Sequence, residues 1–140
     1  MTFTDTHCHL ADPKLADTLP AVLAEAQAVG VARFIVPATS PQDWQAVAQL
    51  ERPSENIHIA LGIHPWFSDG LNEAAFQELE SELIRHPQAW VGEIGLDFYG
   101  KEQTQAQRET QTNVFIHQLI LAQNLNRRVI IHNLKATAAI

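Results

Sequence analysis

The sequence predicts an α/β fold in which successive βα units build a parallel sheet. Three observations lead to this expectation. Short apolar runs alternate with longer segments of helical period along the whole chain, which is the pattern of strands followed by crossover helices. Several of the apolar runs are rich in β-branched residues, which suit a buried, pleated surface. No segment has the composition of an interdomain linker, so residues 1–140 are expected to form a single domain.

Five apolar runs are the expected strands. A short apolar run bounded by turn-forming residues is typical of a strand that is buried on both faces. The expected strands cover residues 3–6, 33–37, 57–63, 90–94 and 128–132.

Helices are expected between these strands. In the first, Leu19 and Leu23 recur at helical spacing, and Gly30 stands where a left-handed C-terminal cap is suited. The second is expected over residues 44–50, with Ser40 as its N-cap.

Two longer helices and the start of a fifth are expected in the second half of the chain. Asn72 can cap the third helix, which carries Leu79 and Leu83 on one face. The fourth is expected over residues 104–124, and a fifth would begin at 133–136.

Composition excludes several classes of protein. The formal net charge of -7 argues against a broad basic face that grips polyanions. The single cysteine, Cys8, excludes an internal disulfide and favours a reducing compartment such as the cytoplasm. The N-terminus lacks the pattern of a signal peptide, and no apolar run approaches the roughly 20 residues that span a bilayer. No membrane association is therefore expected.

The segment Asp5-Thr6-His7-Cys8-His9 is the first candidate metal site. Alternation along a strand points the two imidazoles to the same side, where they can share one cation. The alternative is two polar residues in a loop, because short motifs recur by chance. Cys8 points the other way, so a structural thiol is expected there rather than a nucleophile.

Further polar residues end other apolar strands. Glu93 is expected at the end of the fourth strand and His132 at the end of the fifth, where barrel active sites gather. An unpaired carboxylate in so apolar a run would be costly, and a metal ion would compensate its charge. Each residue alone could instead be a hydrogen-bonded structural group. His64 ends the third strand and is expected to hold a substrate phosphate oxygen rather than a metal.

Two aspartates near these segments have different expected roles. Asp5 could accept a proton from a ligating imidazole, whereas Asp97 could simply cap a loop. Ordinary surface or packing roles are expected for His58, His86 and His117. The donor set suits Zn²⁺, Mn²⁺ or Fe²⁺, and additional oxygen donors would favour Mg²⁺.

These motifs together resemble a known family. In order and spacing they are similar to the successive signatures of TatD-type deoxyribonucleases, and the resemblance spans essentially the whole chain. The matching segments are Asp5-Thr6-His7-Cys8-His9-Leu10, Gly62-Ile63-His64-Pro65, Gly92-Glu93-Ile94-Gly95-Leu96-Asp97 and Val129-Ile130-Ile131-His132.

The resemblance implies a TIM-like (β/α) barrel of the metal-dependent hydrolase type, of which this chain would hold about the first five βα units. It also implies two divalent ions, Mg, Mn or Zn. His7 and His9 would hold one ion, His132 the other, and Glu93 would be the shared, catalytic ligand. The implied reaction is hydrolysis of phosphodiester bonds with DNA as substrate. Lys135 is a further candidate for holding substrate phosphates.

The family pattern also includes a later histidine and a late aspartate, which lie beyond the segments matched here. Five strands of an eight-stranded barrel would leave an open apolar edge, a known aggregation hazard. Impaired activity and a partner chain that covers this edge are therefore expected. Two alternatives stay open: an inactive, truncated remnant that keeps a partial fold and metal binding, and a hydrolase of another ester or amide.

Overall fold

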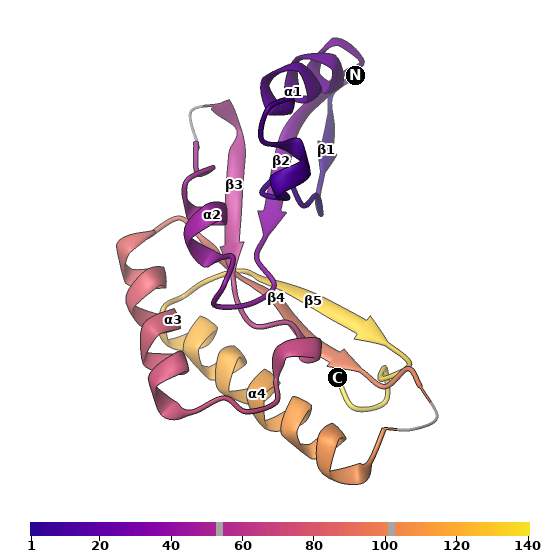
Figure 1. The fold of residues 1–140 in the computed structure, drawn as a ribbon, viewed down its shortest axis with the longest axis vertical. Coiled ribbons are helices and arrows are strands. Elements are labelled where there is room, and N and C mark those ends of the chain that lie inside the picture. The colour runs from indigo at the N-terminus through magenta and orange to yellow at the C-terminus, as the bar shows by residue number, and fades with distance from the viewer. Residues whose placement is uncertain (53–54, 101–102) are drawn as a thin grey trace.

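The computed structural model describes residues 1–52, 55–100 and 103–140 (Figure 1). A single sheet holds five strands in the order β1-β2-β3-β4-β5. The strands are β1 (Phe3–Asp5), β2 (Val31–Pro37), β3 (Ile57–Leu61), β4 (Trp90–Asp97) and β5 (Val129–Leu134). The helices are α1 (Leu19–Ala28), α2 (Trp44–Ala48), α3 (Glu73–Arg85) and α4 (Gln105–Asn124), with short 3₁₀ helices η1 (Pro13–Leu15) and η3 (Pro65–Phe67).

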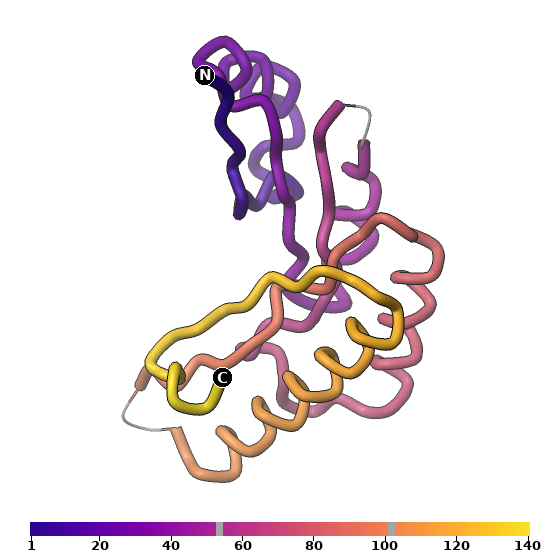
Figure 2. The backbone as a smooth tube through the Cα atoms, turned by 180° about the vertical axis from the view of Figure 1, so that it is seen from behind, coloured from indigo at the N-terminus to yellow at the C-terminus, as the bar shows by residue number. Residues whose placement is uncertain are grey.

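Every strand pairs in parallel with its neighbour in the chain. The helices lie on the outer, convex side of the strongly twisted sheet, so the molecule is bent around a concave face (Figures 1 and 2). β1 pairs with β2 and β5 pairs with β4, so each of these two strands has one open edge among the described strands. The fold is therefore a half-barrel of the expected α/β class.

The core lies between the convex face and the helices. On β2, Phe34 and Val36 are buried in it, while the alternate residues Arg33 and Ile35 line a hollow on the other face. The helices contribute fully buried side chains to the same core, among them Trp44 and Val47 from α2 and Leu79 and Leu83 from α3. The apolar alternation thus decides which face of each strand turns toward the helices.

Several local signals are confirmed. The Asn72 side chain accepts a hydrogen bond from the Ala75 N–H at 3.2 Å and caps α3. Thr104, at the expected start of the fourth helix, caps α4 in a reciprocal capping box with Gln107, a motif that was not identified from the sequence. Gly30 has φ +99°, and a Cβ there would lie 3.1 Å from the Met1 carbonyl oxygen, so a residue without a side chain is needed after α1.

The expected ends of the last two strands are wrong. β4 and β5 continue together to the pair Asp97 and Leu134, because each supplies the backbone partners of the other beyond the first polar residue. The fifth helix expected at 133–136 is also absent from the described part of the chain. Lys135 instead adopts φ +53°, and a turn closed by the Ala139 N–H and the Ala136 carbonyl follows at 2.8 Å.

The expected N-cap of α2 is wrong as well. Ser40 precedes a turn, and the helix begins only at Trp44, with Asp43 as its N-cap residue. The Asp43 carboxylate accepts hydrogen bonds from the backbone N–H of Thr39 at 2.9 Å and of Ser40 at 3.1 Å. An acidic residue that satisfies two loop amides therefore replaces the simple serine cap.

None of the helices in the described ranges is both long and apolar enough to cross a bilayer.

A buried glutamine on α4 holds the segment that follows β3. Gln118 is fully buried, its Oε1 accepts from the Ile63 N–H at 2.7 Å, and its Nε2 donates to the Ile63 carbonyl at 3.1 Å. Both backbone groups of Ile63 are thus satisfied by one side chain, where no neighbouring strand serves them. This contact positions the next residue, His64.

We expect Gln118→Ala to lower the free energy of unfolding by about 2 to 4 kcal/mol, because it leaves two buried backbone groups unpaired. Urea unfolding followed by circular dichroism measures the change. Gln123→Ala, at an exposed position on the same helix, is the matched control and is expected to change stability by less than about 0.5 kcal/mol. Equal stability of the two variants would contradict the role of Gln118.

Candidate metal centre

His7 and His9 lie in the loop that follows β1 rather than on the strand itself. Their imidazoles nevertheless converge, with the two Nε2 atoms 3.3 Å apart. The loop is fixed from both sides: the His7 N–H donates to Asp5 Oδ1 at 3.1 Å, and the Cys8 N–H donates to the Ile35 carbonyl at 3.1 Å. The geometry therefore brings together the two nitrogens that the spacing predicts.

Cys8 lies between these histidines and turns away from them. It is partly buried, and its Sγ lies 3.5 Å from the Ile35 carbonyl oxygen. Burial, with a smaller contribution from the charge of Asp5, raises the pKa of the Cys8 thiol to about 12. A thiol that stays protonated at neutral pH is a poor nucleophile, which agrees with a structural role.

Glu93 lies in the middle of β4, not at its end as the sequence suggested. The pairing of β4 with β5 is irregular between Val91 and Ile94, and there the Glu93 N–H donates to the Ala38 carbonyl beyond β2 at 2.9 Å. The side chain is buried, with 7% of its surface exposed. Among the described residues, the basic side chains near its carboxylate are histidines rather than lysines or arginines.

His132, on β5, lies close to Glu93 because β5 approaches β4 closely at Gly95. Gly95 pairs with His132 and has φ +136°, and any Cβ on Gly95 would collide with the His132 carbonyl oxygen. A glycine at this position therefore allows the two strands to pair closely. As a result, His132 Nδ1 lies 3.0 Å from Glu93 Oε1.

His64 belongs to the same cluster rather than lying beyond it. Its Nε2 is 3.1 Å from His132 Nδ1 and 4.0 Å from Glu93 Oε1. Burial lowers the pKa of His64 to about 4 despite the opposing effect of Glu93. The ring is therefore neutral at pH 7, and its Nδ1 accepts the Trp66 N–H at 3.2 Å. Its expected contact with substrate phosphate stays a prediction.

The two oxygens of Glu93 face two separate groups of candidate ligands. Oε2 is 3.2 Å from His7 Nε2, while Oε1 faces His132. Two sets of potential ligand atoms each lie within 4.8 Å of one another; they are His7, His9 and Glu93, and His64, Glu93 and His132. Neutral imidazoles around a shared carboxylate fit divalent transition ions. The residues present thus fit two ions that share Glu93.

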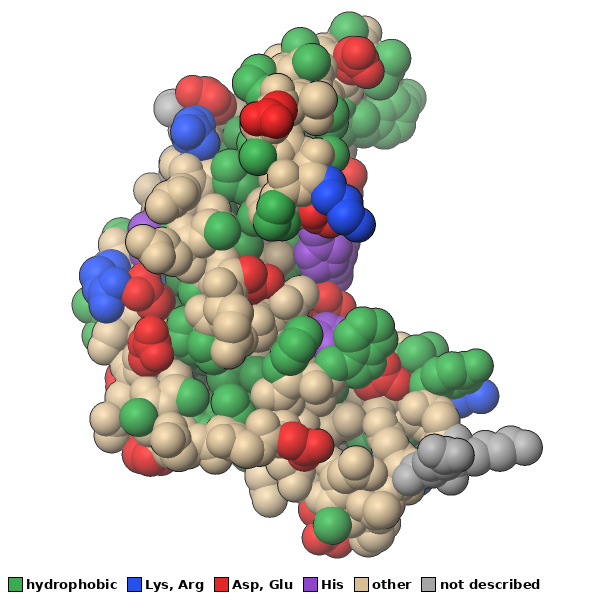
Figure 3. Space-filling view, in the orientation of Figure 1, with side chains coloured by type: hydrophobic (Ala, Val, Ile, Leu, Met, Phe, Trp, Pro, Cys, Tyr) green, Lys and Arg blue, Asp and Glu red, His purple; other side chains and the backbone are tan. Residues whose placement is uncertain are grey.

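This cluster borders an open hollow of about 480 Å³ on the concave side. Figure 3 shows histidine and acidic side chains gathered at the inner angle of the bent molecule. The aromatic side chains of Trp66 and Phe67, from η3, also line the hollow and are 71% and 44% exposed. These aromatic residues were not identified from the sequence, because isolated aromatic residues after a strand carry no periodic signal.

The expected role of Asp5 is wrong, and loop capping is only part of what Asp97 does. Asp5 binds the backbone of His7, whereas Asp97 reaches an imidazole, with its Oδ2 3.2 Å from His132 Nε2. Asp97 also accepts the Tyr99 N–H at 2.9 Å, so it caps the loop as well. Strand alternation from Glu93 to position 97 was the signal that could have revealed this second contact.

Lys135 does not line the histidine hollow. Its Nζ lies 5.0 Å from the centre of the Tyr99 ring, on the exposed surface after β5. Ordinary surface or packing roles were expected for His58, His86 and His117. His86 pairs with Glu51 at 2.7 Å, and the His117 ring stacks on Phe76.

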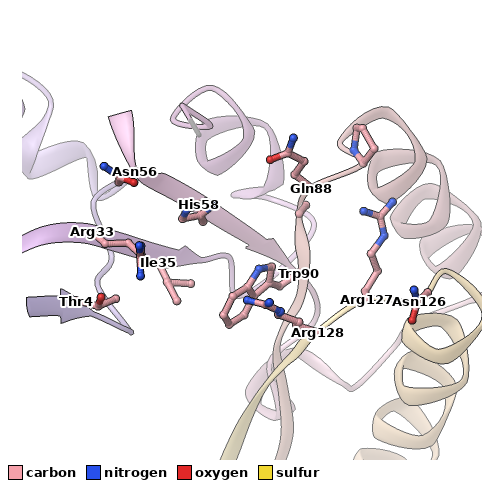
Figure 4. Close-up of a pocket in the computed structure, with 12 residues that line it drawn as sticks. Thr4, Arg33, Ile35, Asn56, His58, Gln88, Trp90, Asn126, Arg127 and Arg128 are labelled. Carbon is pink, nitrogen blue, oxygen red and sulfur yellow. The ribbon is translucent and has the colours of Figure 1, made fainter. Parts of the chain in front are cut away.

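A second hollow of about 670 Å³ lies at the opposite, amino ends of the strands (Figure 4). Its described lining includes three arginines and no acidic residue. Arg128 lies over the Trp90 ring, with its guanidinium carbon 5.2 Å from the ring centre. His58, on β3, also lines this hollow. The concave face therefore separates a basic end from the histidine and carboxylate end.

Comparisons with known proteins agree with this geometry. The family model described as TatD related DNase matches residues 4–140. A protein of Escherichia coli K12 named uncharacterized metal-dependent hydrolase YjjV is 35% identical over 133 residues, covering 94% of this chain and 50% of that protein. Human deoxyribonuclease TATDN3 is 31% identical over 144 residues, covering 94% of this chain and 52% of that protein.

Solved structures show the same fold. The crystal structure of YjjV, a TatD homolog from Escherichia coli K12, matches with a TM-score of 0.87 at 33% identity, over 98% of this chain and 52% of that one. A TatD family hydrolase from Entamoeba histolytica matches with a TM-score of 0.82 at 20% identity, over 99% and 52% of the two chains. The chain thus spans about half the length of the relatives it matches.

We expect Glu93→Gln to weaken binding of Zn²⁺ or Mn²⁺ at both groups by at least about a hundredfold, because it removes the one charged ligand that they share. Competition with a chromophoric chelator measures the affinities. Glu78→Gln, at an exposed position on α3, is the matched control and leaves them unchanged. Loss at one group with the other intact would contradict the shared role.

Proposed function

This chain belongs to the TatD related DNase family, and we propose that it carries the metal-holding part of a hydrolase that cleaves phosphodiester bonds of DNA. The observation that carries the proposal is the single buried carboxylate of Glu93, with one oxygen toward each of two histidine groups. Two divalent ions held about 4 Å apart are a recurrent device for hydrolysing phosphate esters.

The side chains of the cluster have complementary tasks in this proposal. Bound divalent ions would supply Lewis-acid polarisation of a phosphoryl group and lower the pKa of a water. His7 and His9 hold one side of the centre, and His132 holds the other. His64 is neutral and borders the open hollow, where a ring N–H can contact a phosphate oxygen. Glu93 compensates the cations with a charge that is already desolvated.

DNA as the substrate is supported by the chemistry of the site and by the names of relatives. The human relative at 31% identity is named a deoxyribonuclease, and the family model is described as a DNase. The net charge of -7 does not oppose this, because cations at the bottom of an open hollow attract phosphate locally. The alternatives are hydrolysis of another ester or amide at the same centre, and an inactive remnant that still binds metal.

We expect the purified chain to cleave an end-labelled oligonucleotide when Mg²⁺, Mn²⁺ or Zn²⁺ is supplied, and chelator to abolish the activity. Denaturing gel electrophoresis follows the products. Glu93→Gln is expected to lower the rate by about two orders of magnitude or more, since the shared ligand is lost, while Glu78→Gln retains it. Metal binding without turnover would favour the inactive remnant. Turnover of a carboxylic ester or cyclic amide alone would favour the other hydrolase.

We also propose that a further polypeptide covers the open edges of the half-barrel. Phe3 on β1 and Ile131 on β5 are 53% and 41% exposed, and each stands on a strand with one free backbone edge. Exposed apolar edge strands pair readily with other chains. In a full barrel, the remaining strands would occupy the same place as this further polypeptide.

Without that partner, we expect the chain to self-associate as its concentration rises. Sedimentation velocity measures the weight-average mass. Ile131→Lys is expected to reduce association, because a charge on an edge strand blocks further pairing. Ile84→Lys, on α3 at a position that is 60% exposed, tests apolar exposure away from the edges and leaves association unchanged. A monomer at all concentrations would contradict the proposal.

A further inference from the structure

The buried carboxylate of Asp97 is surrounded by hydrogen-bond donors. Asp97 is 2% exposed. Its Oδ1 accepts the Tyr99 N–H at 2.9 Å, and its Oδ2 accepts the indole N–H of Trp66 at 2.7 Å. Burial alone would raise the pKa of Asp97, but these hydrogen bonds, together with His132, hold it below its usual value. The indole and amide N–H groups can only donate, so both oxygens act as acceptors in these contacts, and the His132 Nε2 that lies 3.2 Å from Oδ2 is placed to donate a proton to it.

A second chain of hydrogen bonds reaches His132 from the other side. The backbone N–H of Trp66 donates to His64 Nδ1 at 3.2 Å. That nitrogen is consequently unprotonated, and an imidazole whose Nδ1 accepts a hydrogen bond carries its one ring proton on Nε2. His64 Nε2 lies 3.1 Å from His132 Nδ1. It can donate there only if His132 Nδ1 presents a lone pair.

We propose that Asp97 is a positioning residue that keeps the proton of His132 on Nε2 and so leaves Nδ1 unprotonated, with its lone pair available to the His64 Nε2–H or to an ion beside Glu93. Two independent sets of contacts, one through Trp66 Nε1 and one through His64, lead to this single tautomer. The inference rests on the metal centre of the proposed function, but not on DNA as its substrate.

The assigned tautomer leaves two lone pairs facing each other. His132 Nδ1 and Glu93 Oε1 are 3.0 Å apart, and in this tautomer neither carries a proton. Two acceptors at such a distance repel each other unless a cation lies between or beside them. The hydrogen-bond network therefore prepares a cation site before any ion arrives, which is the usual role of a carboxylate behind a ligating histidine.

The contact with His132 is separable from the loop cap. The Tyr99 amide uses Oδ1, whereas His132 and Trp66 share Oδ2. The backbone of Asp97 is held independently, since its N–H donates to Oε1 of the buried Gln111 on α4 at 3.0 Å. In Asp97→Asn an NH₂ group replaces one carboxylate oxygen of residue 97, and this group faces one of the N–H donors that the oxygen accepted from. The variant thus keeps the shape of the side chain and loses one acceptor and the charge.

The experiment measures the ring protonation of His132 by ¹⁵N NMR at about pH 8, above the usual histidine pKa range, and the Zn²⁺ affinity by chelator competition. Wild-type protein is expected to carry a proton on His132 Nε2. Asp97→Asn is expected to shift the proton toward Nδ1 and to weaken Zn²⁺ binding by about 10- to 100-fold. Trp66→Phe is the matched control: it removes another donor to the same oxygen, leaves the acceptor, and keeps the tautomer.

The outcomes separate this inference from the proposed function. An unprotonated His132 Nε2 in the wild-type protein overturns the inference without any variant, so the test does not depend on folding of Asp97→Asn. Unchanged tautomer and Zn²⁺ affinity in a folded Asp97→Asn protein also overturn it. Wild-type protein that carries the proton on Nε2 yet binds no metal would support the tautomer assignment and contradict the metal centre of the proposed function.

Discussion

The buried carboxylate of Glu93 is the constraint around which the site is arranged. Removing a carboxylate from water costs several kcal/mol unless cations or hydrogen bonds replace the lost solvation. Here the nearby basic groups, among the described residues, are imidazoles on three different chain segments. An imidazole compensates a carboxylate fully only when it is protonated, whereas a metal ion bound by neutral imidazoles does so over a wide pH range. The polarity of the whole concave end follows from this requirement.

Hydrogen bonds from buried side chains to the backbone hold the residues around Glu93 in place. Gln118 fixes the backbone before His64, and Gln111 fixes that of Asp97, so one helix, α4, positions two of the elements behind the centre. The absence of a side chain at Gly95 lets β5 approach β4 closely enough for His132 to reach the carboxylate. Such support matters because ligand geometry tolerates displacements of only a few tenths of an ångström.

Much of this arrangement was predictable from local pattern. The five strands, the parallel order and the capping residue Asn72 follow from apolar runs and turn chemistry, which depend on neighbours in the sequence. The ligand types at positions 7, 9, 93 and 132 were visible because polar residues interrupt apolar strands. Strand ends were less predictable: β4 and β5 run on to Asp97 and Leu134 because each strand pairs with the other, a contact that periodicity does not encode.

The sequence by itself thus determined the fold class, the family and the candidate residues of a metal centre, since these depend on residue type and spacing. Only the tertiary structure decided which oxygen of Glu93 faces which histidine, that His64 joins the cluster, and that Asp97 rather than Asp5 contacts an imidazole. The tertiary structure also decided that Lys135 lies beside Tyr99 and not in the hollow. Hydrogen-bond partners between residues tens of positions apart are set by how strands and helices pack, and short-range patterns carry no record of that packing.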